Sequence, residues 1–206
     1  AYHSFSFAGW YNPARIHFGA LRVLNDDAIA GGGGFGMHPH DNMEIVTIPL
    51  SGDLEHRDSM GNIGVIRQGD VQAMSAGKGV YHSEYNKNAD KPVKLLQIWV
   101  FPKLKNIEPR YDQKTFLPEG RQNKLQLLVA PGGQDGAMDI NQDAYFSLGR
   151  FDAGEVFYYE IKNPGNGVYA FLISGEAEVG GQKLASRDAV GISETDRLEV
   201  KIGDAS

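Results

Sequence analysis

Short apolar runs bounded by turn residues dominate the first hundred positions of the chain. The β-branched run 44–48 ends before Pro49, and the longer run 93–101 ends at Pro102. Both have the length and the proline boundary that are typical of strands. Glycine-containing turn sequences recur at short intervals, at 51–53, 60–62 and 68–70. This pattern predicts a barrel or meander of short antiparallel strands.

The second half of the chain repeats this rhythm of runs and turns. The apolar run 169–173 again leads into a turn. Residues 50–53 resemble residues 173–176, and residues 68–71 resemble residues 186–189. Self-similarity of this kind indicates two copies of one structural unit. No segment has the pattern of a long amphipathic helix. We therefore expect an all-β fold of two small barrels.

The histidines distinguish the two halves. All six lie at or before His82, and the 124 residues that follow (206 − 82) contain none. Residues 102–126 are polar and lack alternation, so we expect them to connect the barrels over the surface. We place the boundary within this connection. The expected domains are a metal-binding barrel at 1–112 and a barrel without metal ligands at 113–206.

Composition and charge narrow the classes of partner. The chain is 41% apolar and has a net charge of −6 without clustered lysines or arginines, which disfavours direct binding to nucleic acid or to an anionic membrane. No apolar stretch approaches the roughly 20 residues of a transmembrane helix, and the first residues lack the features of a signal peptide. The chain has no cysteine, which excludes disulfides and thiolate ligands. We expect a cytoplasmic protein, and a monomer because no long exposed apolar strand requires a partner.

One pair of segments has the pattern of a metal site. His38 and His40 follow a glycine-rich run, and their spacing places them on the same face of a strand, about 7 Å apart. His82 and Glu84 form a second same-face pair. Three imidazole nitrogens and one carboxylate suit a divalent Fe, Mn, Co, Ni, Cu or Zn ion. Four protein ligands leave one or two coordination positions open, as catalysis requires.

These segments resemble the two sequence motifs of cupin barrels. The positions that match are Gly32, His38, His40, Glu44 and Gly52 for the first motif, and Gly69, Gly77, His82 and Asn86 for the second. The first motif has one extra residue before its last glycine, and Ser75 stands where proline is usual. The runs 54–61 and 74–84 are similar to the pirin family, and most of all to bacterial pirin-like quercetin 2,3-dioxygenases. The resemblance implies two cupin (jelly-roll) barrels, a bicupin.

The resemblance also implies the metal ligands. In pirins these are the residues at the positions of His38, His40, His82 and Glu84. Many other cupins use instead the position of Glu44, and alternation does not separate the two, because Glu44 has the same parity as His38 and His40. Following the pirin pattern, we expect Glu84 to be the fourth ligand and Glu44 to orient a ligand imidazole.

The implied reaction is the oxygen-dependent opening of the central ring of a flavonol such as quercetin, with release of carbon monoxide. Iron is the first expected metal because the reaction uses O₂. Glu84 would act as general base on the flavonol 3-hydroxyl, in a pocket lined by Phe35, Met37 and Met74. The alternative is a non-enzymatic role, since other pirins are regarded as iron-dependent regulators that bind partner proteins. Metal-assisted isomerisation or hydrolysis is a third hypothesis, because cupin barrels carry many chemistries.

The remaining histidines are expected to have no role in the site. His56 could lie at the mouth of the barrel, but a surface position on a strand is the favoured interpretation. His3 and His17 lie in an aromatic-rich stretch that is expected to pack over the barrel.

Overall fold

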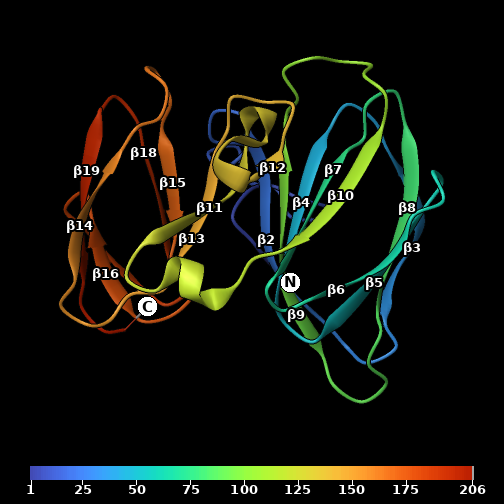
Figure 1. Ribbon diagram of the computed structural model, residues 1–206, viewed down its shortest axis with the longest axis horizontal. Helices are drawn as coiled ribbons and strands as arrows, with labels where there is room; N and C mark the ends of the chain where they lie inside the picture. Colours follow the sequence, from blue (N-terminus) through green and yellow to red (C-terminus); the bar gives the residue numbers. More distant parts are fainter. Residues whose placement is uncertain (206) are drawn as a thin grey trace. The chain divides into compact units, whose positions relative to one another are not determined.

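β-Strands make up nearly all of the regular secondary structure of the chain (Figure 1). The computed structural model describes residues 1–205. The chain divides into two compact units, the first made of Ala1–Leu117 and Leu128–Ala144 and the second of Pro118–Leu127 and Tyr145–Ser206. The all-β class predicted from the pattern of runs and turns is confirmed.

The first unit is a barrel of two antiparallel sheets, which face each other in Figure 1. One sheet contains, in spatial order, β1 (Tyr2–His3), β2 (Leu21–Ile29), β9 (Val93–Val100), β4 (Glu44–Ser51), β7 (Asp70–Ser75) and β10 (Arg110–Thr115). The other contains β3 (Gly34–His40), β8 (Val80–Asn86), β5 (Asp53–Asp58) and β6 (Ile63–Arg67).

The interior of this barrel has apolar clusters on both sides of a polar layer. One cluster consists of Ile29, Leu54, Ile66, Val93 and Leu95. The other consists of Ile45, Met74, Ala76 and Val80. Thr47 of β4 and Gln97 of β9 are register partners between the two clusters, and both are buried. Buried polar groups need hydrogen-bond partners, so this layer marks the part of the interior that is built for polar chemistry.

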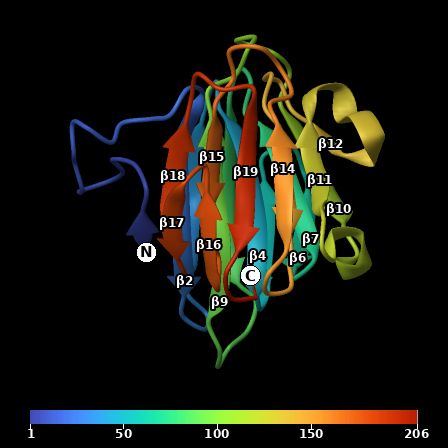
Figure 2. The same ribbon diagram turned by 90° about the vertical axis from the view of Figure 1, so that its left-hand side faces the viewer.

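The second unit contains two sheets of its own. The first has, in spatial order, β14 (Val156–Glu160), β19 (Arg197–Ile202), β16 (Glu176–Val179) and β17 (Gln182–Ala185) (Figure 2). The second pairs β15 (Val168–Phe171) with β18 (Ala189–Ile192). The other elements of the chain are β11 (Leu125–Ala130), β12 (Met138–Asp139), β13 (Phe146–Gly149) and the 3₁₀ helices η1 (Pro118–Arg121) and η2 (Pro131–Gly136).

The two units repeat one topology. The order β14-β19-β16-β17 reproduces β3-β8-β5-β6 strand for strand along the chain, and the pair β15-β18 reproduces β4-β7. Gly52 and Gly175 occupy corresponding turns with φ of 80° and 83°, a conformation that glycine adopts without steric cost. These glycines lie in the two similar segments 50–53 and 173–176. The repeat predicted from the sequence is therefore present as a bicupin fold.

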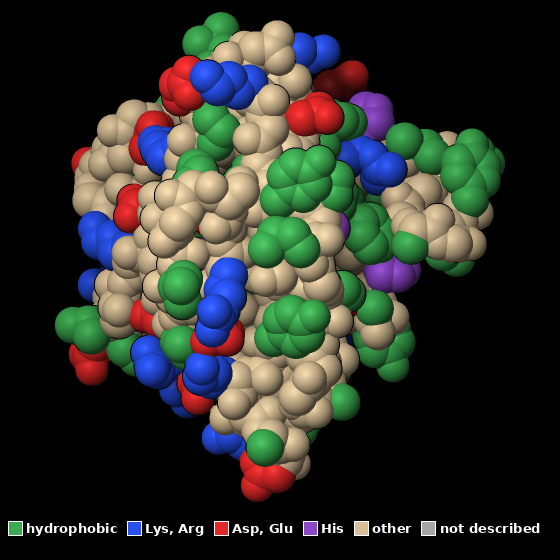
Figure 3. Space-filling view, turned by 90° about the vertical axis from the view of Figure 1, so that its right-hand side faces the viewer, with side chains coloured by type: hydrophobic (Ala, Val, Ile, Leu, Met, Phe, Trp, Pro, Cys, Tyr) green, Lys and Arg blue, Asp and Glu red, His purple; other side chains and the backbone are tan. Residues whose placement is uncertain are grey.

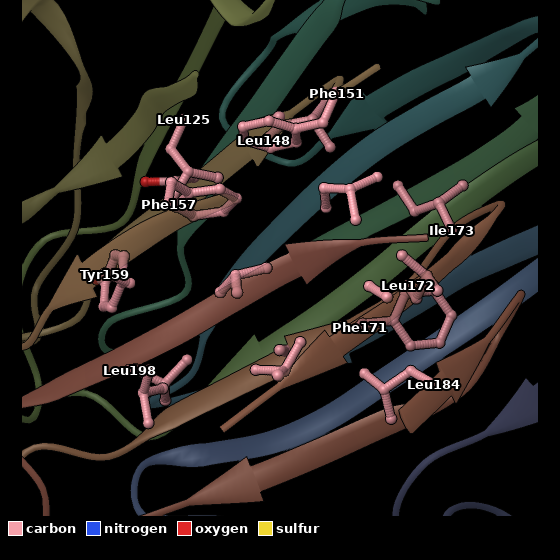
Figure 4. Close-up of a pocket in the computed structure, with 18 of the residues that line it drawn as sticks. Leu125, Leu148, Phe151, Phe157, Tyr159, Phe171, Leu172, Ile173, Leu184 and Leu198 are labelled. Carbon is pink, nitrogen blue, oxygen red and sulfur yellow. The ribbon is translucent and has the colours of Figure 1, made fainter. Parts of the chain in front are cut away.

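The second unit contains an apolar pocket of about 240 Å³ (Figure 4). The rings of Phe151 and Phe157 stack in its lining at 4.5 Å between centroids. In the first unit, β9 lies between β2 and β4. Among the described residues, no strand of the second unit takes the corresponding place between β13 and β15. The residues that line the pocket include no histidine, aspartate or glutamate. Metal chemistry therefore has to be sought in the first unit.

The connection between the units differs from the expected surface loop. Residues 110–115 form β10, which pairs with β7 from Arg110↔Ser75 to Thr115↔Asp70. β10 lies at the edge of its sheet, and an edge strand tolerates a polar sequence because one side meets solvent. The expected boundary between residues 112 and 113 falls inside this strand. We propose that the first barrel extends to Leu117.

The helices of residues 1–205 are short. The two 3₁₀ helices have four and six residues, and no described helix is long and apolar enough to span a membrane.

Candidate metal site

Strands β3 and β8 position all four candidate ligands, His38 and His40 on β3 and His82 and Glu84 on β8. His38 and His82 are register partners, so their side chains lie next to each other on one face of the sheet. The pairing register of β3 with β8 shifts between Phe35 and His38, as it does at a β-bulge. Gly34 allows the strands to approach, because a Cβ at this position would lie 2.4 Å from the carbonyl oxygen of Glu84. The glycine-rich run thus serves the close pairing of the two strands.

The imidazoles of His38, His40 and His82, called here the three-histidine group, converge on one another. The ring centroids are 4.4 Å apart for His38 and His82, 4.8 Å for His40 and His82, and 4.9 Å for His38 and His40. One nitrogen of each ring lies within 4.8 Å of the others. His38 Nδ1 is 2.7 Å from the carbonyl oxygen of Gly36, so Nδ1 is the protonated nitrogen and Nε2 is available as a ligand atom.

Burial keeps His40 and His82 in the form that binds metal. His82 is 1% exposed, and its Nε2 is buried without a hydrogen-bond partner. Desolvation lowers the pKa of His82 to about 3 and, together with the nearby His38, the pKa of His40 to about 4. Neutral imidazoles with a free lone pair are metal ligands. An otherwise unsatisfied buried nitrogen in such a group fits a divalent ion.

Glu84 lies at the edge of this group, in the polar layer. Gln97 Nε2 donates to Glu84 Oε2 at 2.8 Å, and the Thr47 hydroxyl is 3.5 Å from Oε1. Burial raises the pKa of Glu84 to about 7. One of its oxygens lies within 4.8 Å of nitrogens of both His82 and His56. The carboxylate is therefore next to one member of the three-histidine group.

Among the described residues, two sets of side chains have ligand atoms within 4.8 Å of one another: the three-histidine group, and His56 with His82 and Glu84. Glu44 belongs to neither set. Strand β3 ends at His40, and the chain turns at Asn42, which has a φ of 44°. Glu44 is the first residue of β4, which belongs to the opposite sheet. Glu44 Oε2 accepts hydrogen bonds from the Ser75 hydroxyl at 2.7 Å and from the backbone N–H of Asn141 at 3.1 Å. The parity argument fails because the chain changes sheets, and the expectation that Glu44 orients a ligand imidazole is wrong.

His56 is buried, so the favoured expectation of a surface residue is wrong. It is 0% exposed, and its ring stacks on that of Tyr111 at 4.6 Å between centroids. Its Nδ1 lies 3.5 Å from His82 Nδ1 and its Nε2 lies 3.1 Å from Asp58 Oδ2. Alternation could have placed His56 and Asp58 on one face, but nothing in the sequence indicates which face is buried.

The apolar residues expected around the site are divided between surface and interior. Phe35 and Met37 are 47% and 59% exposed, whereas Met74 is buried. Figure 3 shows apolar side chains exposed on the side of the first unit where β3 and β8 lie, at the right of Figure 1. The sequence interpretation missed Trp99, whose ring lies 4.8 Å from that of His40 and whose Nε1 is buried without a partner. Trp99 thus supplies a free donor beside the site.

The two N-terminal histidines lie outside the site. His3 Nδ1 is 2.8 Å from Asn25 Oδ1, and His17 Nδ1 is 2.9 Å from the carbonyl oxygen of Gly19. Phe7 contacts Trp99 edge to face at 5.3 Å, as expected for an aromatic stretch that packs against the barrel.

Comparison with known proteins places both halves of the chain. The sequence model of the Pirin family matches residues 1–100, and that of the quercetinase C-terminal cupin domain matches residues 127–206. The crystal structure of YhhW from Escherichia coli has a TM-score of 0.95 and 36% identity, and the match covers 100% of this chain and 86% of that one. The structure of the same bacterial pirin in complex with nickel(II) has a TM-score of 0.92 over 99% of this chain and 87% of that one, also at 36% identity.

Curated relatives match over nearly the whole chain. Quercetin 2,3-dioxygenase of Escherichia coli strain K12 is 38% identical over 97% of this chain and 85% of the relative. A pirin-like protein of Caulobacter vibrioides is 40% identical over 94% of this chain and 83% of the relative. Together with the bicupin fold and the three-histidine group, these matches show that the chain belongs to the pirin family.

Proposed function

We propose that this chain is a metal-dependent dioxygenase that opens the central ring of flavonols such as quercetin. The observation that carries the proposal is the three-histidine group, in which the buried Nε2 of His82 lacks a partner. The name of the Escherichia coli relative, quercetin 2,3-dioxygenase, supports the same activity. The proposed metal ligands are His38, His40, His82 and Glu84.

The donor set determines which ions fit the site. Imidazole nitrogens with one carboxylate suit Fe, Mn, Co, Ni, Cu or Zn, and a nickel(II) complex of a 36% identical relative is known. Iron is the first choice because the proposed reaction consumes O₂. When bound, the ion supplies Lewis acidity to the flavonol hydroxyl and reactivity toward O₂.

Glu84 is proposed to take the proton of the flavonol 3-hydroxyl. The single hydroxyl hydrogen of Thr47 is donated to Gln97 Oε1 at 2.8 Å, so it does not serve Glu84 Oε1 at 3.5 Å. Gln97 Nε2 holds the other carboxylate oxygen at 2.8 Å. Glu84 Oε1 therefore lacks a close donor and is the atom that receives the proton.

Apolar side chains beside the site exclude water from the reacting groups. Ile45, Met74 and Val80 form a buried cluster against which Trp99 packs, and the Trp99 ring contacts His40. Exclusion of water strengthens electrostatic interactions and prevents side reactions. The balanced reaction breaks two ring C–C bonds of the flavonol, retains both oxygen atoms of O₂ in the products and releases one ring carbon as carbon monoxide.

Oxygen uptake with quercetin tests this proposal. Metal-free protein should be inactive, and protein loaded with iron(II) should consume one O₂ and release one carbon monoxide per quercetin. Glu84→Gln should bind flavonol but lose turnover by about 100-fold or more, because the proton acceptor is removed. Protein fully loaded in turn with Fe, Mn, Ni, Co and Cu that leaves a panel of flavonols unchanged would contradict the proposal.

Glu44→Gln is the matched control for the carboxylate. Its side chain contacts Ser75 and Asn141 rather than a histidine, so we expect metal content and turnover to remain at the level of the unmodified protein. Loss of metal from Glu44→Gln with retention in Glu84→Gln would reverse the assignment of the fourth ligand.

A regulatory role that depends on binding a partner protein stays a prediction. A stoichiometric partner recovered with one oxidation state of the iron-loaded protein only would favour it over catalysis.

A further inference from the structure

A chain of buried polar contacts leads from the three-histidine group to the far side of β8. His82 Nδ1 lies 3.5 Å from His56 Nδ1, and His56 Nε2 lies 3.1 Å from Asp58 Oδ2. The side chains of His56 and Asp58 are 0% exposed. The register explains the arrangement, since β5 pairs with β8 so that His56 opposes Glu84 and Asp58 opposes His82. Strand β8 thus has ligand partners in β3 on one side and this pair in β5 on the other.

Asp58 is firmly fixed at the end of the chain of contacts. Its Oδ1 accepts hydrogen bonds from the backbone N–H groups of Met60 at 2.9 Å and Asn62 at 3.0 Å. Its Oδ2 accepts one from Asn62 Nδ2 at 2.8 Å. A carboxylate that is held by several N–H donors stays ionised and acts only as an acceptor. The His56 nitrogen that faces Asp58 must therefore carry a hydrogen.

The tautomers of both histidines follow from this constraint. A neutral imidazole has one donor and one acceptor nitrogen. Because His56 Nε2 donates to Asp58, His56 Nδ1 has the lone pair and accepts the hydrogen of His82 Nδ1. The remaining nitrogen, His82 Nε2, then has its lone pair free, and it is the buried atom without a partner. Gln72 Nε2, 3.5 Å from His56 Nδ1, is a second donor to the same atom.

We propose that His56 and Asp58 are positioning residues that fix the tautomer and the ring orientation of His82 through the relay Asp58–His56–His82. The inference rests on the proposed metal site, and it assigns a role to two residues that are not ligands. Partners behind a ligand histidine orient the ring, and their removal weakens metal binding by about 10- to 100-fold.

Nitrogen-15 NMR of the imidazoles tests the tautomers directly on the full chain. Loaded with Zn²⁺, which is diamagnetic, the protein should show His82 protonated on Nδ1 and His56 protonated on Nε2. Protonation of His56 on Nδ1, or of His82 on Nε2 in the metal-free protein at neutral pH, would overturn the relay. This readout needs no variant and no catalytic turnover.

Two variants of His56 with side chains of similar shape test how much the acceptor nitrogen of His56 contributes to metal binding. Leu and Asn side chains have nearly the same size, but only Asn offers an acceptor at the position of Nδ1. His56→Leu should weaken Zn²⁺ binding by about 10- to 100-fold, measured by competition with a chromophoric chelator, and His56→Asn should recover most of that loss. Equal losses in both variants would mean that His56 acts only by packing and would contradict the proposal.

Tyr111→Phe is the control for packing around His56. The Phe ring retains the stacking on His56 and removes only the hydroxyl group, which donates to Gln113. Zn²⁺ affinity should stay unchanged. Failure of the metal site and failure of the relay give different results. Unmodified protein that binds no Zn²⁺ refutes the metal site. Tight Zn²⁺ binding with the wrong histidine tautomers refutes only the relay. If the His56 variants do not fold, the NMR result decides.

Discussion

Glu84 and His82 are both buried at this site, and burial acts on them in opposite directions. Desolvation disfavours whichever form is charged, so it lowers the pKa of His82 to about 3 and raises the pKa of Glu84 to about 7. At neutral pH the metal-free protein therefore keeps His40 and His82 neutral, and Glu84 lies near the midpoint of its titration. A cation would favour the ionised carboxylate and the neutral imidazole together.

The stability of the metal-free protein should reveal the Glu84 shift through its pH dependence. A carboxyl whose pKa rises from 4.5 to about 7 on folding stabilises the protein below pH 4.5, and this contribution is lost as the pH rises toward 7. Glu84→Gln resembles the protonated form at every pH. Its free energy of unfolding relative to the unmodified protein should therefore increase from pH 4.5 to 7, by on the order of 2 kcal/mol.

Urea unfolding in the presence of EDTA, at half-unit steps of pH, measures this difference. Comparing the two proteins at each pH cancels the opposite contribution of the histidines. A difference that does not change with pH would show that the Glu84 pKa is not shifted.

At the scale of elements, the turn between β7 and β8 holds the start of the strand that carries His82. The N–H of Ala76 donates to the carbonyl oxygen of Met43, and that of Lys78 donates to the carbonyl oxygen of Ile107. Gly77 has a φ of 51°, and a Cβ there would lie 2.1 Å from the Ile107 oxygen. Only glycine fits between these backbone segments.

Gly77→Ala should therefore destabilise the protein by more than its φ value alone would cost. A left-handed alanine costs about 1–2 kcal/mol, and forcing an atom into a packed site adds about 1–3 kcal/mol. Gly61→Ala is the matched control, because Gly61 has a φ of 93° with no atom within 4 Å of its Cβ position. Chemical denaturation of both variants measures the difference, and equal losses would contradict the predicted clash.

At the scale of the whole molecule, the topology is duplicated but the chemistry is not. The first unit contains all six histidines, including the three-histidine group. The second has the same strand order around an apolar pocket without metal-ligating side chains. Metal binding should therefore stabilise the two units unequally.

Hydrogen exchange measures this inequality residue by residue. At a free metal concentration of 100 times its dissociation constant, binding stabilises the bound unit by about 2.7 kcal/mol, so exchange through opening of the site should slow about 100-fold in β3 and β8. Exchange in residues 156–202 should remain as in EDTA. Equal protection of both units, or protection that persists in His82→Ala, would contradict a site confined to the first barrel.

Local sequence determined the all-β class, the repeat and the three histidines of the site. Period-two alternation and turn glycines act between neighbours in the chain, so β-branched runs and positions such as Gly52 and Gly175 specify strands and turns without tertiary context. His38 and His40 share a face for the same reason. Within one uninterrupted strand, the even or odd spacing of two residues is sufficient to predict whether they share a face.

Only the tertiary structure decided what lies around those histidines. The even spacing of His40 and Glu44 does not place them on one face, because the chain turns at Asn42 and enters the opposite sheet. Spacing along the sequence also leaves open which face of β5 is buried, which is why the sequence alone favours a surface position for His56. Residues 110–115 are polar and were expected to lie in a surface connection, but they form β10 because they pair with β7. Each of these outcomes depends on which strands become neighbours, and strand pairing joins residues that are distant in the sequence.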